Sequence, residues 1–205
     1  RTLAVTIWYP AAANSVEQSI SRDGIFPGSG AQDAALRPTP ERFPLVLLSH
    51  GSGGDGSNLA WLAEALASHG YLAAAVAHPG NRLGDYSVEG RLAVWRRAHE
   101  LSGMLLFLLA DPTFGPRIDQ RRIAAAGHSS GGLTVLELAG ARFQPAAYLA
   151  YCRGPNVGPD CAMVSGVDLT KIPDLSGAAI SGRDRHVRAV VAMAPLIPGT
   201  PAAAT

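Results

Sequence analysis

The sequence has no block of like charge and no long apolar run. Its 17 Lys and Arg and 16 Asp and Glu residues leave a formal net charge of +1 over 205 residues. This balance gives no electrostatic reason to expect nucleic acid or an anionic membrane surface as a partner. The most apolar stretch, 103–110, is far shorter than the roughly 20 residues that cross a bilayer, so we expect a buried helix and no transmembrane segment. A 47% hydrophobic content excludes a disordered chain. Oligomeric state is not predicted.

Cysteine is scarce, since only Cys152 and Cys161 are present. The segment between them is rich in Gly, Pro and Asn, which suits a local disulfide across a loop. Two unpaired thiols are the alternative, and a metal site is weaker because two thiols without a nearby His are too few ligands. A disulfide would favour an exported protein, periplasmic or secreted, and its absence a cytoplasmic one.

The chain starts at Arg1 rather than Met, and strand-like sequence begins at once. Its last residues follow an apolar run without the closing helix that a doubly wound sheet normally has. We therefore expect a chain truncated at both ends, whose signal peptide can be neither seen nor excluded.

Short apolar segments alternate with amphipathic ones along most of the chain. The strand candidates are 3–9, 45–49, 71–77, 122–126 and 187–193. The helix candidates are 58–69, 89–110 and 131–141. This alternation predicts an α/β fold, a doubly wound and mostly parallel sheet with helices on both faces. We expect one incomplete domain over 1–205, with loop-rich insertions at about 11–42 and 142–185.

The strongest motif is G-x-S-x-G at 127–131, between the apolar strand RIAAA and the helical stretch LTVLELAG. A serine on such a sharp turn stands clear of the sheet, and Gly127 and Gly131 let the flanking chains approach closely. Ser129 is therefore the candidate nucleophile. A Gly/Ser turn that only caps a helix is the alternative.

A second motif, SHGSGG at 49–54, ends the strand LVLLSH. In a hydrolase this loop gives a backbone N–H to the oxyanion hole. We expect Ser52 to supply that donor and Ser130, next to the nucleophile, to supply the second. A phosphate-binding loop is the competing interpretation, and it fails because G-x-G-x-x-G and GxxxxGK[ST] are both absent here.

These residues resemble the α/β-hydrolases of the platelet-activating factor acetylhydrolase and dienelactone hydrolase type. The resemblance rests on segments in the family's order: IWYP at 7–10, FPLVLLSHGSGG at 43–54, LASHGYLAAAVAHPGN at 66–81, IAAAGHSSGG at 123–132 and VRAVVAMAP at 187–195. It implies the α/β-hydrolase fold with its C-terminal strands missing. It also implies hydrolysis of small or short-acyl carboxyl esters through an acyl-enzyme on Ser129, with no metal or organic cofactor.

The triad acid and histidine have no candidates in the expected places. In this fold the chain order is Ser, Asp, His, so both are expected beyond Thr205. Asp184 and His186 are rejected because they precede the strand 187–193 and should lie at the opposite end of the sheet from Ser129. Residues 1–205 alone are therefore expected to be nearly inactive.

Four residues are expected to support the loop or line the pocket: His50, Gly51, His78 and His128. His50 is expected to brace the oxyanion loop by hydrogen bonding. His78 is expected to line the pocket, with proton acceptance from Ser129 as the weaker alternative, and His128 to pack under the elbow. The pair Arg96 and Arg97 is expected on a solvated helix surface.

Two other functions remain open at this point. One is a non-catalytic binding protein with a hydrolase fold. The other keeps the fold but changes the chemistry to peptidase, thioesterase or acyltransferase. A small-molecule ester remains the expected partner.

Overall fold

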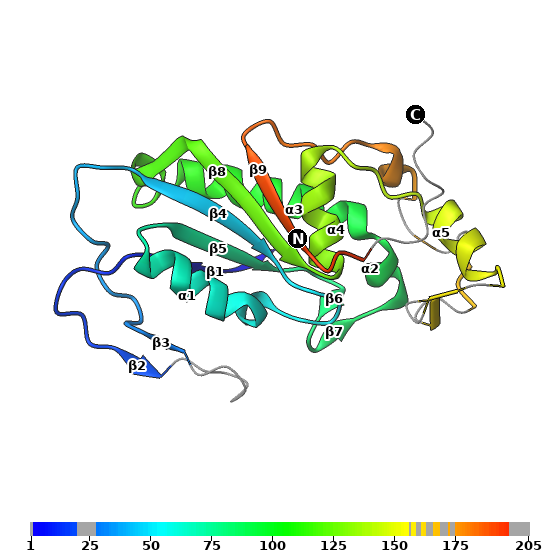
Figure 1. The fold of residues 1–205 in the computed structure, drawn as a ribbon, viewed down its shortest axis with the longest axis horizontal. Coiled ribbons are helices and arrows are strands. Elements are labelled where there is room, and N and C mark those ends of the chain that lie inside the picture. The colour runs from blue at the N-terminus through cyan, green and yellow to red at the C-terminus, as the bar shows by residue number, and fades with distance from the viewer. Residues whose placement is uncertain are drawn as a thin grey trace.

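A five-stranded sheet forms the centre of the molecule (Figure 1). The computed structural model describes residues 2–19, 28–155, 157–158, 161–162, 166–168, 172 and 175–196. The sheet order is β1 (Ala4–Trp8), β5 (Leu72–Ala77), β4 (Phe43–Ser49), β8 (Ile118–His128) and β9 (Ala189–Met193). Only β1 runs antiparallel to its neighbour among these strands of the described chain. The carboxyl ends of the four parallel strands therefore lie together, where such sheets bind ligands.

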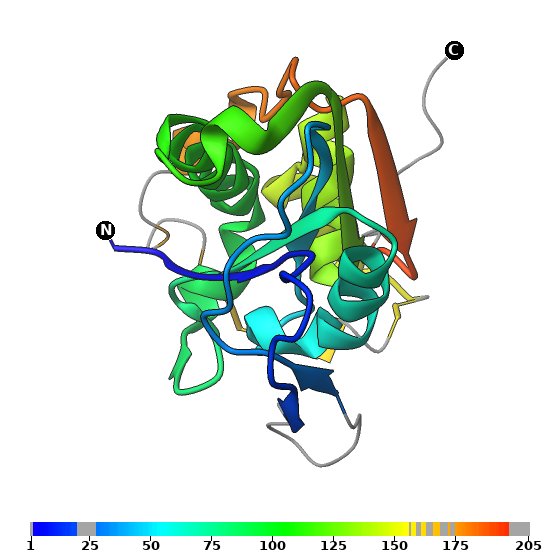
Figure 2. The same cartoon turned by 90° about the vertical axis from the view of Figure 1, so that its left-hand side faces the viewer.

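Helices cover both faces of the sheet (Figure 2). On β4, Leu45 and Leu47 point to the face that packs against α3 (Val94–Ala110) and α4 (Ser130–Ala139). Val46 and Leu48 point to the other face, toward α1 (Ala60–Ser68). This alternation follows from the two-residue period of a strand. The α/β-hydrolase architecture predicted from the sequence is confirmed.

Shorter elements join these layers. They are α2 (Val88–Leu92), α5 (Pro145–Cys152), the hairpins β2 (Gln18–Ser19) with β3 (Ser29–Gly30) and β6 (Asn81–Arg82) with β7 (Asp85–Tyr86), and 3₁₀ turns at Gly56–Leu59, Gly115–Arg117 and Leu175–Ala179. The helix predicted over 89–110 is two helices, because the backbone at Ala93 turns to ψ 45°. The stretch 142–185, predicted as a loop-rich insertion, contains α5.

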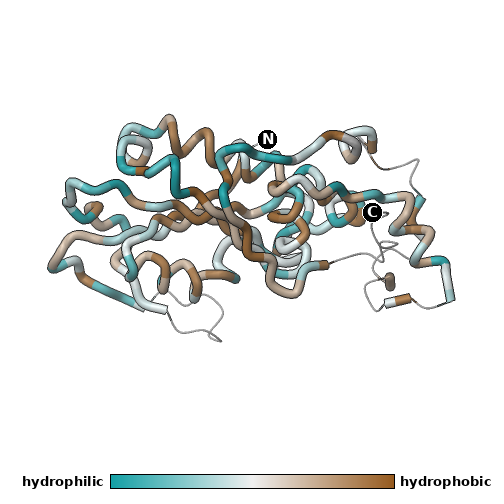
Figure 3. Tube along the Cα trace, turned by 45° about the horizontal axis from the view of Figure 1, so that its top comes forward, coloured by the Kyte–Doolittle hydropathy of each residue, from teal (hydrophilic) through white to brown (hydrophobic). Residues whose placement is uncertain are grey.

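Apolar residues concentrate on the central strands, as the hydropathy colours of Figure 3 show. A second buried cluster joins α5 to the start of α3, and its members include Trp95, Phe143, Tyr148 and Leu149. Part of the 142–185 stretch is therefore packed against helices α2, α3 and α4 rather than free in solvent. Within the described ranges, no helix has the length and apolar content needed to span a bilayer.

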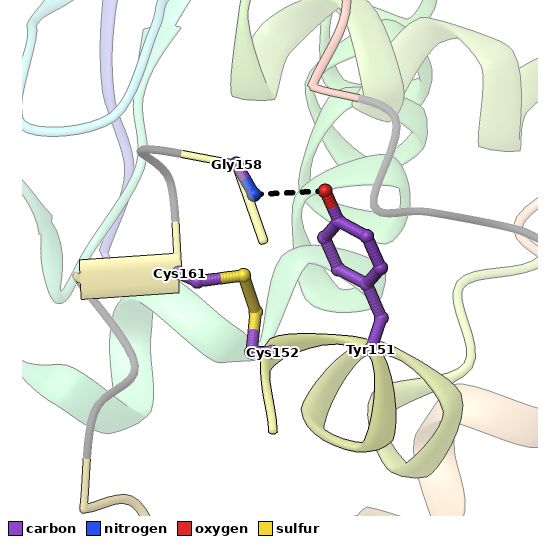
Figure 4. The surroundings of a disulfide bond; sticks show 4 residues. All are labelled: Tyr151, Cys152, Gly158 and Cys161. Carbon is purple, nitrogen blue, oxygen red and sulfur yellow. Dashed lines mark hydrogen bonds between the residues drawn. A yellow bond between two sulfur atoms is a disulfide. The ribbon is translucent and has the colours of Figure 1, made fainter. Parts of the chain in front are cut away.

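Cys152 and Cys161 form a disulfide, which decides between the two alternatives that the sequence left open (Figure 4). It links the end of α5 to the following loop, with the two Cα atoms 5.1 Å apart. The Tyr151 hydroxyl accepts a hydrogen bond of 2.9 Å from the Gly158 N–H in the same loop. These two contacts tie the loop back onto α5.

Candidate active site

Ser129 lies at the turn where β8 ends and α4 begins, at the carboxyl end of the sheet. Its backbone has φ 55° and ψ −119°, a conformation that residues with a Cβ atom rarely adopt. Its side chain is partly exposed. This geometry has the strained backbone and accessible hydroxyl that the G-x-S-x-G motif predicts.

Two glycines make room for this turn. A Cβ atom on Gly127 would lie 2.1 Å from the carbonyl oxygen of Gly131. A Cβ atom on Gly131 would lie 1.9 Å from the carbonyl oxygen of Ser49. Both distances are far below van der Waals contact with backbone, so only glycine fits either position without moving a strand or helix.

Strand β9 fixes the turn from the other side. The Ser129 N–H donates a 3.0 Å hydrogen bond to the carbonyl oxygen of Met193. The Ser129 carbonyl oxygen accepts a 3.0 Å hydrogen bond from the Leu196 N–H. These bonds hold the peptides on both sides of Ser129 and leave its side chain outside the ladder.

The oxyanion loop, defined here as residues 50–54, passes beside Ser129. A Cβ atom on Gly51 would lie 3.5 Å from the Cβ atom of Ser129, so Gly51 and the candidate nucleophile are in close approach. The N–H of Ser130 is at the first position of α4, where no intrahelical partner exists and the helix dipole is positive. The structure thus brings the two sequence motifs together at one end of the sheet.

A buried chain of hydrogen-bonded polar side chains lies under this loop. The Ser49 Oγ atom is 2.9 Å from Nε2 of His78, and His78 Nδ1 is 2.7 Å from a carboxylate oxygen of Glu100 on α3. Burial holds the pKa of His78 well below its usual value, so the ring is neutral. Its Nδ1–H then donates to Glu100, and its Nε2 accepts from the Ser49 hydroxyl.

This Ser-His-Glu chain resembles a catalytic triad but cannot act as one. The exposed fractions of Ser49 and His78 are both 0%, so no substrate reaches them. The expectation that His78 lines the pocket is therefore wrong, because its ring is enclosed between β4, β5 and α3. Both ring nitrogens are also engaged, which removes His78 as the proton acceptor for Ser129.

His50 is buried within the oxyanion loop itself. Its Nδ1 lies 2.6 Å from the Gly51 carbonyl oxygen, and its Nε2 accepts a 3.1 Å hydrogen bond from the His78 N–H. Burial, with the nearby charge of Arg97, lowers the pKa of His50 to about 4. A neutral His50 therefore donates from Nδ1 to the loop backbone, the contact expected of a residue that braces it.

Arg97 is 2% exposed, so the prediction that it lies on a solvated helix surface is wrong. Its guanidinium donates hydrogen bonds to the carbonyl oxygen of His50 and, at 3.3 Å, to Ser49 Oγ. Burial lowers the pKa of Arg97 to about 9, and Glu100 and Glu137 oppose that shift. The cation thus lies below the oxyanion loop.

Two further predictions are tested by the fold. His128 is exposed, so it does not pack under the elbow as expected, because its side chain emerges at the end of β8 beside Gly51. Asp184 and His186 pair with each other at 2.8 Å before β9 begins, at the opposite end of the sheet from Ser129, as predicted. In the described part of the chain, no three His, Cys, Asp or Glu side chains gather to hold a metal ion.

The β6–β7 hairpin, which supports Ser52, was not predicted from the sequence. The Asn81 side-chain oxygen accepts hydrogen bonds from Ser52 Oγ at 3.0 Å and from the Gly53 N–H at 2.9 Å. The Tyr86 hydroxyl lies 3.1 Å from Ser52 Oγ. The turn sequence NRLGDY, with the turn-forming pair Gly84-Asp85, was the available signal for this hairpin.

Comparison with known proteins gives matches to part of the chain. The family model described as platelet-activating factor acetylhydrolase, isoform II, matches residues 27–83. The platelet-activating factor acetylhydrolase of Cavia porcellus is 29% identical over 140 residues, which cover 48% of this chain and 32% of the relative. Over these segments the chain is similar to α/β-hydrolases of the platelet-activating factor acetylhydrolase type.

Two other matches are named as a cutinase and an esterase. Cutinase est1 of Thermobifida alba is 35% identical over 102 residues, covering 49% of this chain and 31% of the cutinase. A solved ferulic acid esterase from Streptomyces cinnamoneus shares 36% identity, covers 52% of this chain and 36% of its own, and has a TM-score of 0.44. The chain covers about a third of the length of the curated relatives that it matches.

Proposed function

We propose that the protein is a serine carboxyl ester hydrolase that acts on small or short-acyl esters. The observation that carries this proposal is the backbone of Ser129, at φ 55° on the turn between β8 and α4, with Gly51 of the oxyanion loop packed beside it. Relatives named as a cutinase and a platelet-activating factor acetylhydrolase support the same reaction class.

In the proposed reaction, the Ser129 hydroxyl oxygen attacks the ester carbonyl carbon and loses its proton to a base. The carbonyl oxygen becomes negative and accepts hydrogen bonds from the N–H groups of Ser52 and Ser130. The C–O bond to the alcohol then breaks, the alcohol takes the proton, and the acyl group stays on Ser129. Water releases it by the same steps.

The base and its acid partner are proposed to follow the residues described. His50 and His78 have their ring nitrogens engaged in the buried chain, and His186 lies at the far end of the sheet. The order Ser, Asp, His of this fold supports a later Asp and His. Ser129 would be a weak nucleophile without them.

Replacement of the nucleophile tests the proposal in the complete protein. Ser129→Ala should lower kcat for a short-chain aryl ester by at least about 10⁴-fold, because the acyl-enzyme cannot form. The melting temperature should not fall. Turnover at the wild-type level in Ser129→Ala would refute the assignment. A wild-type complete protein that binds esters but does not hydrolyse them would refute it as well. Comparison of ester, thioester and amide substrates separates esterase from peptidase, thioesterase or acyltransferase chemistry.

Export from the cytoplasm is part of the proposal. Disulfides persist in oxidising compartments such as the periplasm or the extracellular space. The Cys152–Cys161 bond supports that location. Fractionation of the native host, with activity in the periplasm or medium, is the expected result, and activity confined to the cytoplasm would contradict it.

A further inference from the structure

Arg97 has no place in the proposed reaction, although it is a fully buried cation directly below the site. A buried charge is costly unless several hydrogen bonds compensate it. Arg97 is 2% exposed, and its two recorded hydrogen-bond acceptors are Ser49 Oγ and the His50 carbonyl oxygen. Both acceptors belong to the segment that carries the oxyanion loop. Such a group at that place requires a reason beyond packing.

The geometry of a peptide links these contacts to the oxyanion hole. In a trans peptide the C=O and N–H point in opposite directions, so fixing one fixes the other. Arg97 holds the carbonyl of the peptide that joins His50 to Gly51. His50 Nδ1 holds the carbonyl of the next peptide, which joins Gly51 to Ser52. The N–H of Ser52 is therefore turned away from the buried chain, and among the described residues it has no hydrogen-bond partner.

Arg97 is also connected to the other side chains of the buried hydrogen-bonded chain. Ser49 accepts from Arg97 and donates to His78, and His78 donates to Glu100 on the same helix as Arg97. Glu137 on α4 adds a second carboxyl group near the guanidinium. Helix α3 is thereby joined to the ends of β4 and β5 through Nη2 of Arg97 and the carboxylate of Glu100, while Nε and Nη1 of Arg97 have no hydrogen-bond partner among the described residues.

We propose that Arg97 is a positioning residue for ester hydrolysis: it holds the His50–Gly51 peptide from below, and His50 holds the next peptide so that the Ser52 N–H faces the developing oxyanion. This inference rests on the proposed function. Arg97 does not touch the substrate. Its effect is expected on the transition state, where the oxyanion exists, and not on substrate binding.

Three substitutions of Arg97 in the complete protein test this inference. Arg97→Met removes every donor and should lower kcat by about 10²- to 10³-fold, the loss typical of one oxyanion donor. Arg97→Gln should behave similarly. Arg97→Lys keeps the charge but not the planar fork, and should lower kcat by roughly tenfold. KM should stay within about threefold in all three.

Affinity for a trifluoromethyl ketone, which forms a tetrahedral adduct with a serine hydroxyl, should fall in parallel with kcat/KM. A purely structural role would lower the melting temperature without this parallel loss. Arg121→Met is the control, because the Arg121 side chain is 91% exposed on β8, and it should leave kcat unchanged.

Any folded Arg97 variant with kcat within about threefold of wild type overturns the inference, and so does a loss confined to KM. If Arg97→Met does not fold, Arg97→Lys decides by the same criteria. Ser129→Ala, measured in parallel, separates the two proposals. Loss of turnover in Ser129→Ala with normal Arg97 variants refutes only the positioning role, whereas retained turnover in Ser129→Ala refutes the proposed function.

Discussion

Ser129 keeps its backbone at φ 55° although an L-residue there costs about 1–3 kcal/mol. The bonds to Met193 and from Leu196 hold the serine on both sides. The glycines at 127 and 131 remove the atoms that would otherwise push β8 and α4 apart. The strain is thus maintained by the surrounding backbone, which allows the hydroxyl to project from the sheet.

Substitution of Gly131 should disrupt this arrangement. Gly131→Ala places a Cβ atom 1.9 Å from the Ser49 carbonyl oxygen. We expect a loss of roughly 3 kcal/mol or more in unfolding free energy, since backbone must move. Denaturant unfolding measures it.

Gly103→Ala is the matched control, because nothing lies within 4 Å of a Cβ atom there and the residue is exposed in α3. It should raise the unfolding free energy by about 0.5–1 kcal/mol. Equal effects of the two substitutions would contradict the role assigned to the glycine at 131.

Glu137 should make the free energy of unfolding fall as pH rises. Burial raises its pKa from 4.5 to about 7. The folded state therefore binds the proton more tightly than the unfolded state, so this contribution is complete below pH 4.5 and is lost as pH rises to about 7. Relative to wild type, Glu137→Gln should gain about 3 kcal/mol of unfolding free energy between pH 4.5 and about pH 8.

Urea unfolding of both proteins across that range measures the difference. Titration of His50 and His78 occurs in both and cancels. A difference that does not change with pH would show that Glu137 is ionised normally in the folded protein.

Local backbone geometry was predictable where a motif fixes it. In the turn at 127–131 and the loop at 49–54, the positions of glycine and serine determine the backbone geometry. The buried chain through Arg97 was missed because Arg is usually exposed. The signal was nevertheless present, since Arg97 lies three residues after Val94 and four before Leu101, on the apolar stripe of the helix.

At the scale of elements, all five sheet strands were predicted from short apolar runs, and the parallel direction of β5, β4, β8 and β9 follows from the β-α alternation, whereas the order of the strands was not predicted. The break between α2 and α3 was not predicted, because Ala93 is a good helix former and its turn depends on tertiary packing. Helix α5 was missed for a similar reason. Its hydrophobic partners, including Trp95 and Leu133, come from distant segments.

The disulfide should stabilise α5 locally. It closes a loop with a sequence separation of 9, for which chain entropy predicts about 2–3 kcal/mol. Replacement of both cysteines by serine should speed amide exchange in Pro145–Cys152 while β4 and β8 stay protected. A reductant should speed amide exchange in α5 of the wild type and should leave exchange in the double variant unchanged. Unchanged exchange in α5 would contradict this local role.

On the scale of the whole molecule, the candidate site residues and the residues that support them lie at one end of the sheet. The oxyanion loop follows β4, His78 follows β5 and Ser129 follows β8, all at carboxyl ends of parallel strands. The three segments lie together because of the sheet topology, and this is predictable once the strands are known to be parallel. Substrate preference is not predictable in this way, since it depends on pocket walls and not on the sheet.

The most direct test of the central claim is to identify the atom that an ester-like inhibitor modifies. An alkyl fluorophosphonate should lose fluoride and form one P–O bond to Ser129, so the intact mass rises by one phosphonyl group. Peptide mapping of the complete protein should place that mass on Ser129 and none on Ser130 or Ser49. An unmodified Ser129, or modification of another serine at the same rate, would contradict the account.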